Sequence, residues 1–106
     1  MEKMMNKPEA SMAIQILPTT KNATEEEVFG VVDAAIARLK ASGLNVFVGP
    51  FESTVEGPLE TLLELQKELI ELSVKEGAIS VAVYSKIFYS PEKGTWTIDE
   101  KVAKHQ

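Results

Sequence analysis

The sequence contains no cysteine, one histidine, one arginine and no long apolar segment. The absence of cysteine excludes disulfides, thiol nucleophiles and zinc sites built on thiolates. The histidine is His105, beside the last residue, so the usual general base of a nucleophilic triad is missing from the body of the chain. These absences predict a protein that is not an enzyme and that carries no metal and no cofactor.

Basic residues are fewer than acidic ones. The 106 residues include 11 Lys and Arg against 16 Asp and Glu, which gives a net charge of -5. Nucleic-acid binding requires clustered positive charge, so this balance disfavours a nucleic-acid partner. No apolar run approaches the roughly 20 residues of a membrane helix, and residues 1–10 lack the apolar centre of a secretory signal. We expect a flexible leader over 1–10, a single domain over 11–106, no membrane partner and a cytoplasmic location.

Glycine-rich phosphate-binding motifs are also missing. Neither G-x-G-x-x-G nor G-x-x-x-x-G-K-[ST] occurs in the chain. Residues 25–27 are three successive glutamates, but they follow Thr24 directly and are better explained as the first turn of a helix than as a metal site. The loop over 18–23 lacks the arginine of acylphosphatases and the glycine usual in amino-acid-sensing ACT domains, which disfavours both functions.

Hydrophobic periodicity and turn residues divide the chain into strands and helices. Thr24 and Glu27 form a capping box, and Gly43 and Gly77 are typical of helix C-termini. The patterns predict strands over 11–17, 44–48, 51–56 and 79–89, helices over 25–41 and 58–76, a short fifth strand over 95–98, and a helical turn around Val102 capped by Asp99.

The resulting order predicts an α+β fold of the ferredoxin-like βαββαβ type. Its antiparallel sheet carries two helices on one face and, here, an extra short C-terminal strand. The strands over 11–17 and 79–89 are apolar on both faces, so we expect a second copy to cover the other face of the sheet. The protein is therefore expected to be a homo-oligomer.

Polar side chains interrupt the two strands expected at the centre of the sheet. Gln15 lies in the first strand, and Glu52, Thr54 and Glu56 alternate along the third. Buried polar groups cost free energy unless they are hydrogen-bonded. These four side chains therefore either pair with one another across an oligomer interface or bind a ligand, and the residues alone leave both alternatives open.

The chain carries QILP at 15–18, VFGVVD at 28–33, IDEKV at 98–102 and, most distinctively, VGPFESTVEG at 48–57. With these segments it resembles the thiamine-binding protein family of the YkoF-like superfamily, over about residues 11–104. The resemblance implies a homodimer built sheet to sheet, often assembled into a homotetramer, and no known catalytic activity. It also implies binding of thiamine or its hydroxymethylpyrimidine part, for carriage, sequestration or sensing.

Polar ligand-binding residues follow from the resemblance together with the chemistry of an aminopyrimidine, which has an amine donor and ring-nitrogen acceptors in one plane. Thr54 offers a hydroxyl, Glu56 a carboxylate, and Gln15 an amide that both donates and accepts. Glu56 and Thr54 also have structural explanations. Glu56 could accept a hydrogen bond from the N-terminus of the following helix, and Thr54 could be an ordinary strand residue.

An aromatic contact is expected as well, because a flat heterocycle stacks on aromatic rings and a cationic thiazolium is attracted to their faces. Phe51, Tyr84 and Phe88 are the candidates. Phe51 completes the predicted ligand-binding set, since it lies in the most distinctive family-like segment, although a core position is its structural alternative.

A different class of function remains open beside small-molecule binding. Leu65 and Leu72 widen the apolar face of the second helix. They fit either a wider contact with the core or contact with another protein. In the second case the protein would be an oligomeric structural or regulatory protein that acts through protein–protein contacts.

Overall fold

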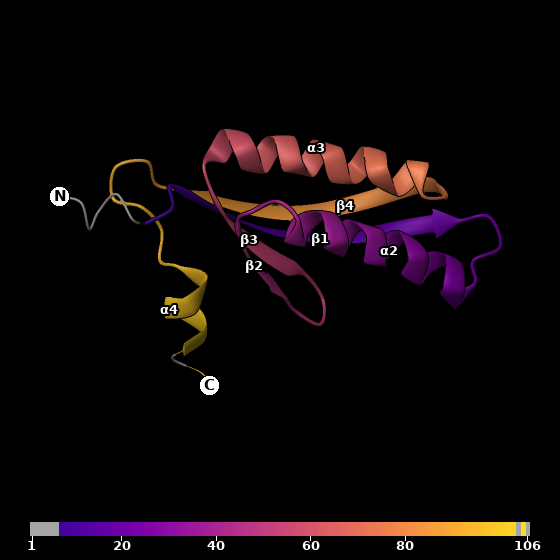
Figure 1. Cartoon of the computed structure of the whole chain (residues 1–106), viewed down its shortest axis with the longest axis horizontal. Helices are drawn as coiled ribbons and strands as arrows, with labels where there is room; N and C mark the ends of the chain where they lie inside the picture. Colours follow the sequence, from indigo (N-terminus) through magenta and orange to yellow (C-terminus); the bar gives the residue numbers. More distant parts are fainter. Residues whose placement is uncertain (1–6, 104, 106) are drawn as a thin grey trace.

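The computed structural model describes residues 7–103 and residue 105, and in them one antiparallel sheet carries two long helices on one face (Figure 1). The elements in chain order are β1 Ala10–Thr20, α2 Glu25–Lys40, β2 Asn45–Val48, β3 Ser53–Gly57, α3 Leu59–Lys75, β4 Ala78–Tyr89 and α4 Ile98–Ala103. The strand order is β2-β3-β1-β4, so β1 and β3 are the central neighbours. The predicted ferredoxin-like βαββαβ fold is confirmed. No helix in the described part of the chain is long and apolar enough to span a membrane.

Strand β1 is longer than the sequence predicts. It pairs with β4 over its whole length to Thr20, but with β3 only as far as Ile14. Pro18, the residue after the predicted strand 11–17, therefore lies where β1 has only one neighbour. A proline is tolerated at such a position because one side of the strand needs no ladder hydrogen bonds.

Helix α2 begins where the sequence predicts, because Thr24 caps it. The Thr24 hydroxyl oxygen accepts a hydrogen bond from the Glu27 N–H at 3.1 Å. The Glu27 carboxylate accepts two hydrogen bonds from Asn22, from its backbone N–H at 3.0 Å and from its side-chain amide at 2.8 Å. The loop that precedes α2 is thereby tied to its first turn.

Helix α3 supplies leucines to the hydrophobic core beneath the two long helices. Leu62 and Leu69 are fully buried against β1 and β3. Leu65 belongs to the same cluster and is only 3% exposed, whereas Leu72 is half-buried. The wide apolar face of α3 therefore serves the core at Leu65, which removes one of the two residues on which the protein-partner alternative depended.

The predicted fifth strand over 95–98 is wrong, because the sheet in the described residues has four strands and the chain forms α4 instead. The cause is a second capping box. The Thr97 hydroxyl oxygen accepts from the Glu100 N–H at 3.0 Å, and a Glu100 carboxylate oxygen accepts from the Thr97 N–H at 2.8 Å. Asp99, the predicted cap, lies inside the first turn. Figure 1 shows α4 apart from α2 and α3, and it contacts β2 and β3.

The residues just before β1 are bonded to the rest of the fold. A Glu9 carboxylate oxygen accepts a hydrogen bond from the Leu59 N–H at 2.9 Å, and the Pro8 carbonyl accepts one from the Thr95 N–H at 2.8 Å. Ala10, the last residue of the predicted flexible leader, is the first residue of β1 and is completely buried. The remainder of that leader, residues 1–6, lies outside the described residues.

Candidate functional site

The register of the sheet assigns side chains to its two faces, because residues opposite each other in an antiparallel pair point the same way. The core residues Met12 and Val55 are opposite each other, on the face that α2 and α3 cover. Along each strand, the residues that alternate with these core positions point to the other face of the sheet, which we call the open face. It comprises Ser11, Ala13, Gln15 and Leu17 of β1, Thr54 and Glu56 of β3, Asn45 and Phe47 of β2, and Ala82, Tyr84, Lys86 and Phe88 of β4.

Gln15 and Thr54 lie close together on the open face. Thr54 is directly opposite Ala13, so Gln15 is its diagonal neighbour, at roughly 7–8 Å between backbones. Both residues are half-buried, and neither side chain has a hydrogen-bond partner among the residues that the structure describes. Thr54 lines a hollow of about 280 Å³ together with Ser11 and Lys86. Two of the predicted ligand-binding residues are thus near each other on the open face, and their side-chain donors and acceptors are unused.

Glu56 is on the same face, but its carboxylate is already bonded. One oxygen accepts from the Asn45 side-chain amide at 2.8 Å, and the other accepts from the backbone N–H of Ile98 at 2.7 Å. The residue is only 9% exposed. The sequence offered a structural role for Glu56, in which it accepts a hydrogen bond from the N-terminus of the following helix, α3. The structure shows a bond of this kind, but to the N-terminus of α4, 42 residues away.

Aromatic side chains flank the polar pair. Tyr84 is directly opposite Gln15 on β4 and is 62% exposed, and Phe47 is opposite Thr54 on β2. Phe51 lies in the turn between β2 and β3 and is 82% exposed, so it is not a core residue. Phe47 escaped prediction because only the pairing of β2 with β3 places it opposite Thr54.

An ion pair crosses the central strand on the open face. The Lys86 ammonium of β4 lies 3.4 Å from a carboxylate oxygen of Glu52, which precedes β3. Because β1 separates these two strands, the pair passes over it beside Gln15. An exposed pair of this kind adds little to stability, but it sets the charges next to the candidate site.

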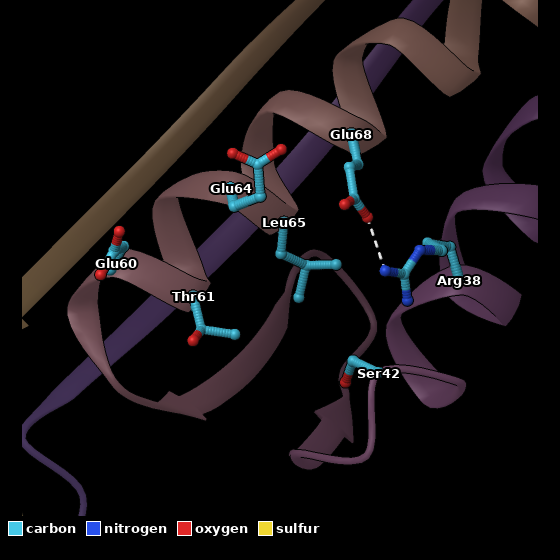
Figure 2. A pocket seen from close by; sticks show the side chains of 7 residues that line it. All are labelled: Arg38, Ser42, Glu60, Thr61, Glu64, Leu65 and Glu68. Carbon is cyan, nitrogen blue, oxygen red and sulfur yellow. Dashed lines mark hydrogen bonds and ion pairs between the residues drawn. The ribbon is translucent and has the colours of Figure 1, made fainter.

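The helix side of the molecule has a separate hollow of about 310 Å³ between α2 and α3 (Figure 2). Its wall on α3 includes Glu60, Glu64 and Glu68, and Arg38 of α2 forms an ion pair with Glu68. No three His, Cys, Asp or Glu side chains of the described chain are placed to hold a metal ion. None of the predicted ligand-binding residues lines this acidic groove, so the open face is the candidate site.

Comparison with known proteins points to one family. The family model described as thiamine-binding protein matches residues 12–106. A UPF0045 protein of Clostridium perfringens is 38% identical to this chain over 96 residues, which make up 91% of this chain and 96% of that protein. The match in sequence therefore extends over nearly the whole of both proteins.

Solved structures also match this chain over nearly its whole length. A domain of unknown function, DUF77, from Bacillus cereus superposes with a TM-score of 0.83 at 37% identity, covering 97% of this chain and 94% of its own. A Thermotoga maritima protein proposed to act in thiamine biosynthesis or salvage superposes with a TM-score of 0.76 at 30% identity, covering 92% of this chain and 98% of its own.

Proposed function

The chain belongs to the thiamine-binding protein family, and we propose that it binds thiamine or the hydroxymethylpyrimidine part of thiamine on the open face of its sheet. One observation carries the proposal. Gln15 and Thr54 lie together on that face, half-buried and without hydrogen-bond partners among the described residues. The role proposed for the Thermotoga maritima neighbour, thiamine biosynthesis or salvage, supports a thiamine-related ligand.

The chemistry of these side chains matches one edge of an aminopyrimidine. The Gln15 amide carbonyl can accept a hydrogen bond from the exocyclic amine of the ligand while its NH₂ group donates to a ring nitrogen. The Thr54 hydroxyl can accept from the amine or donate to a ring nitrogen. Tyr84, opposite Gln15, offers a ring on which the flat heterocycle stacks. The same ring face suits the positive thiazolium of intact thiamine.

The other two predicted residues take different parts in the proposal. Glu56, whose two oxygens are already bonded, holds α4 and Asn45 at one end of the face and shapes the site from there. Phe51 lies at the rim, in the turn beside β3, where its exposed ring can lie against a bound ligand. Gln15 and Thr54 therefore make the polar contacts.

A second copy of the chain is expected to close the site. Leu17, Tyr84 and Phe88 are exposed large side chains on the open face, and an uncovered apolar face of this kind is typical of an association surface. Two chains placed sheet to sheet would remove water from around Gln15 and Thr54, which strengthens their hydrogen bonds to a ligand. The assembly we propose is a homodimer, with a dimer of dimers as its larger form.

The proposed role is non-catalytic: carriage, sequestration or sensing of the ligand. Gln15, Thr54 and Tyr84 can orient a ring through hydrogen bonds and stacking, and none of them is an activated nucleophile. A ligand held only by such contacts is released unchanged. A binding assay is therefore the appropriate test.

Isothermal titration calorimetry tests the proposal with thiamine and hydroxymethylpyrimidine as separate ligands. We expect saturable heat with the wild-type protein. Gln15→Leu and Thr54→Val should each weaken binding about five- to tenfold or more, because each removes hydrogen bonds that a polar ligand then leaves unmade. Thr61→Val is the matched control, since Thr61 lines the helix-side groove and its hydroxyl is remote from the open face. Absence of heat at millimolar ligand would contradict the proposal.

A further inference from the structure

Lysines gather where the open face meets α4. Two adjoining hollows lie there, of about 510 Å³ and 280 Å³, and Phe88 and Lys101 line both. Lys7 and Lys93 also line the larger hollow, and Lys86 lines the smaller one. We call Lys7, Lys86, Lys93 and Lys101 the lysine cluster; it contains four of the chain's 11 basic residues.

The positive charge of the lysine cluster is only partly balanced. The Lys7 ammonium lies 3.4 and 3.5 Å from the two carboxylate oxygens of Glu100, and the Lys86 ammonium lies 3.4 Å from one oxygen of Glu52. Lys93 and Lys101 form no ion pair with any described residue. No Asp or Glu is among the described residues that line either hollow. The ammonium groups of Lys93 and Lys101 are therefore available to attract an anionic group bound in either hollow.

The cluster is continuous with the proposed ligand site. Thr54 lines the smaller hollow together with Lys86 and Lys101. Ser90 lines the larger hollow, and its hydroxyl has no partner among the described residues. The exposed ring of Phe88 stands between the two hollows. A heterocycle bound at Thr54 would thus direct an attached group toward the lysines.

We infer that the ligand is bound as its phosphate ester, with the ring at Gln15 and Thr54 and the phosphate at the lysine cluster. This inference rests on the function proposed above. A phosphate monoester carries about -1.5 to -2 charge at neutral pH and three acceptor oxygens, which match ammonium and hydroxyl donors. Hydroxymethylpyrimidine is neutral and thiamine is a cation, so neither of these unphosphorylated forms uses the lysines.

Calorimetry with matched ligands tests the inference. The ligands are hydroxymethylpyrimidine and its phosphate, thiamine and thiamine monophosphate, and inorganic phosphate alone. We expect each phosphate ester to bind at least about tenfold more tightly than the unphosphorylated compound, its parent, because charge-assisted hydrogen bonds are stronger than neutral ones. The double variant Lys93→Met/Lys101→Met should lose that preference and keep its affinity for the parents, because methionine preserves the apolar stem of lysine.

The control double variant Lys40→Met/Lys75→Met makes the same change in net charge at the C-terminal turns of α2 and α3, and it should keep the preference. Esters that bind no better than their parents would overturn the inference and leave the proposed function standing. Equal loss in both double variants would also overturn it, and so would inorganic phosphate that binds as tightly as an ester. If neither parents nor esters bind, the proposed function itself fails.

Discussion

The Glu56 carboxylate joins the central sheet to the C-terminal helix, because one of its oxygens accepts a hydrogen bond from the Ile98 N–H at 2.7 Å. Its other oxygen accepts from the Asn45 side chain, so one buried charge links β2, β3 and α4. Lys101 of the lysine cluster is part of that helix. The position of α4 therefore depends on Glu56.

Replacing Glu56 by glutamine should loosen α4. In the wild-type protein, the Asn45 amide and the Ile98 N–H each donate to a carboxylate oxygen of Glu56. In the variant, the NH₂ group of the glutamine would face one of these two donors and could not accept its hydrogen bond. Hydrogen bonds to charged groups contribute about 1.5–3 kcal/mol. We expect Glu56→Gln to lower the free energy of unfolding by about 1–3 kcal/mol and to speed amide hydrogen exchange over residues 98–102. Glu64→Gln, on the exposed side of α3, is the control and should change stability by less than about 0.5 kcal/mol. Equal effects of the two variants would contradict this role of Glu56.

The stability that Glu100 contributes should depend on pH. The hydrogen bond from the Thr97 N–H, with Lys7 nearby, holds the pKa of the Glu100 carboxyl below its usual range. Because the folded-state pKa is the lower one, this contribution is present above the unfolded pKa and disappears as the pH falls through the folded pKa. The stability difference between wild type and Glu100→Gln, from urea unfolding, should be largest near neutral pH and shrink on acidification. A difference that stays constant with pH would rule out this linkage.

Charge placed on the open face should prevent self-association. Tyr84→Glu introduces a carboxylate that two facing copies would have to bury, which is costly for an unpaired charge. We expect the wild-type protein to run as a dimer or larger on size exclusion with light scattering, and Tyr84→Glu as a monomer. Leu63→Glu places the same charge on an exposed position of α3 and should leave the mass unchanged. A monomeric wild-type protein would contradict the proposed assembly.

Local sequence signals predicted most of the fold. Thr24 caps α2 through a bond that its spacing from Glu27 indicates, and a left-handed Gly77 follows α3 as its position suggested. At the C-terminal end, the apolar and aromatic residues of 95–98 predicted a strand, whereas the capping box of Thr97 and Glu100 starts a helix at Ile98. The T-x-x-E spacing of this capping box is itself a local sequence signal.

The site was harder to predict because its geometry comes from contacts distant in sequence. The βαββαβ order predicted that the strands carrying Gln15 and Thr54 are neighbours, but only the register of the pair, with Thr54 opposite Ala13, places the two side chains on one face. Nothing local to Glu56 indicates that its partner is Ile98, and no pattern links Lys7 to the turn that carries Lys93. Such neighbours are set by tertiary packing, which periodicity does not encode.

The most direct test of the central claim is an NMR titration of the wild-type protein with hydroxymethylpyrimidine. The proposed site predicts saturable shifts of the Gln15 side-chain amide and the Thr54 methyl signals, and intermolecular contacts between the pyrimidine and the Tyr84 ring. The Thr61 methyl in the helix-side groove should not move. Shifts confined to Thr61 and its neighbours, or no shifts at millimolar ligand, would contradict binding on the open face.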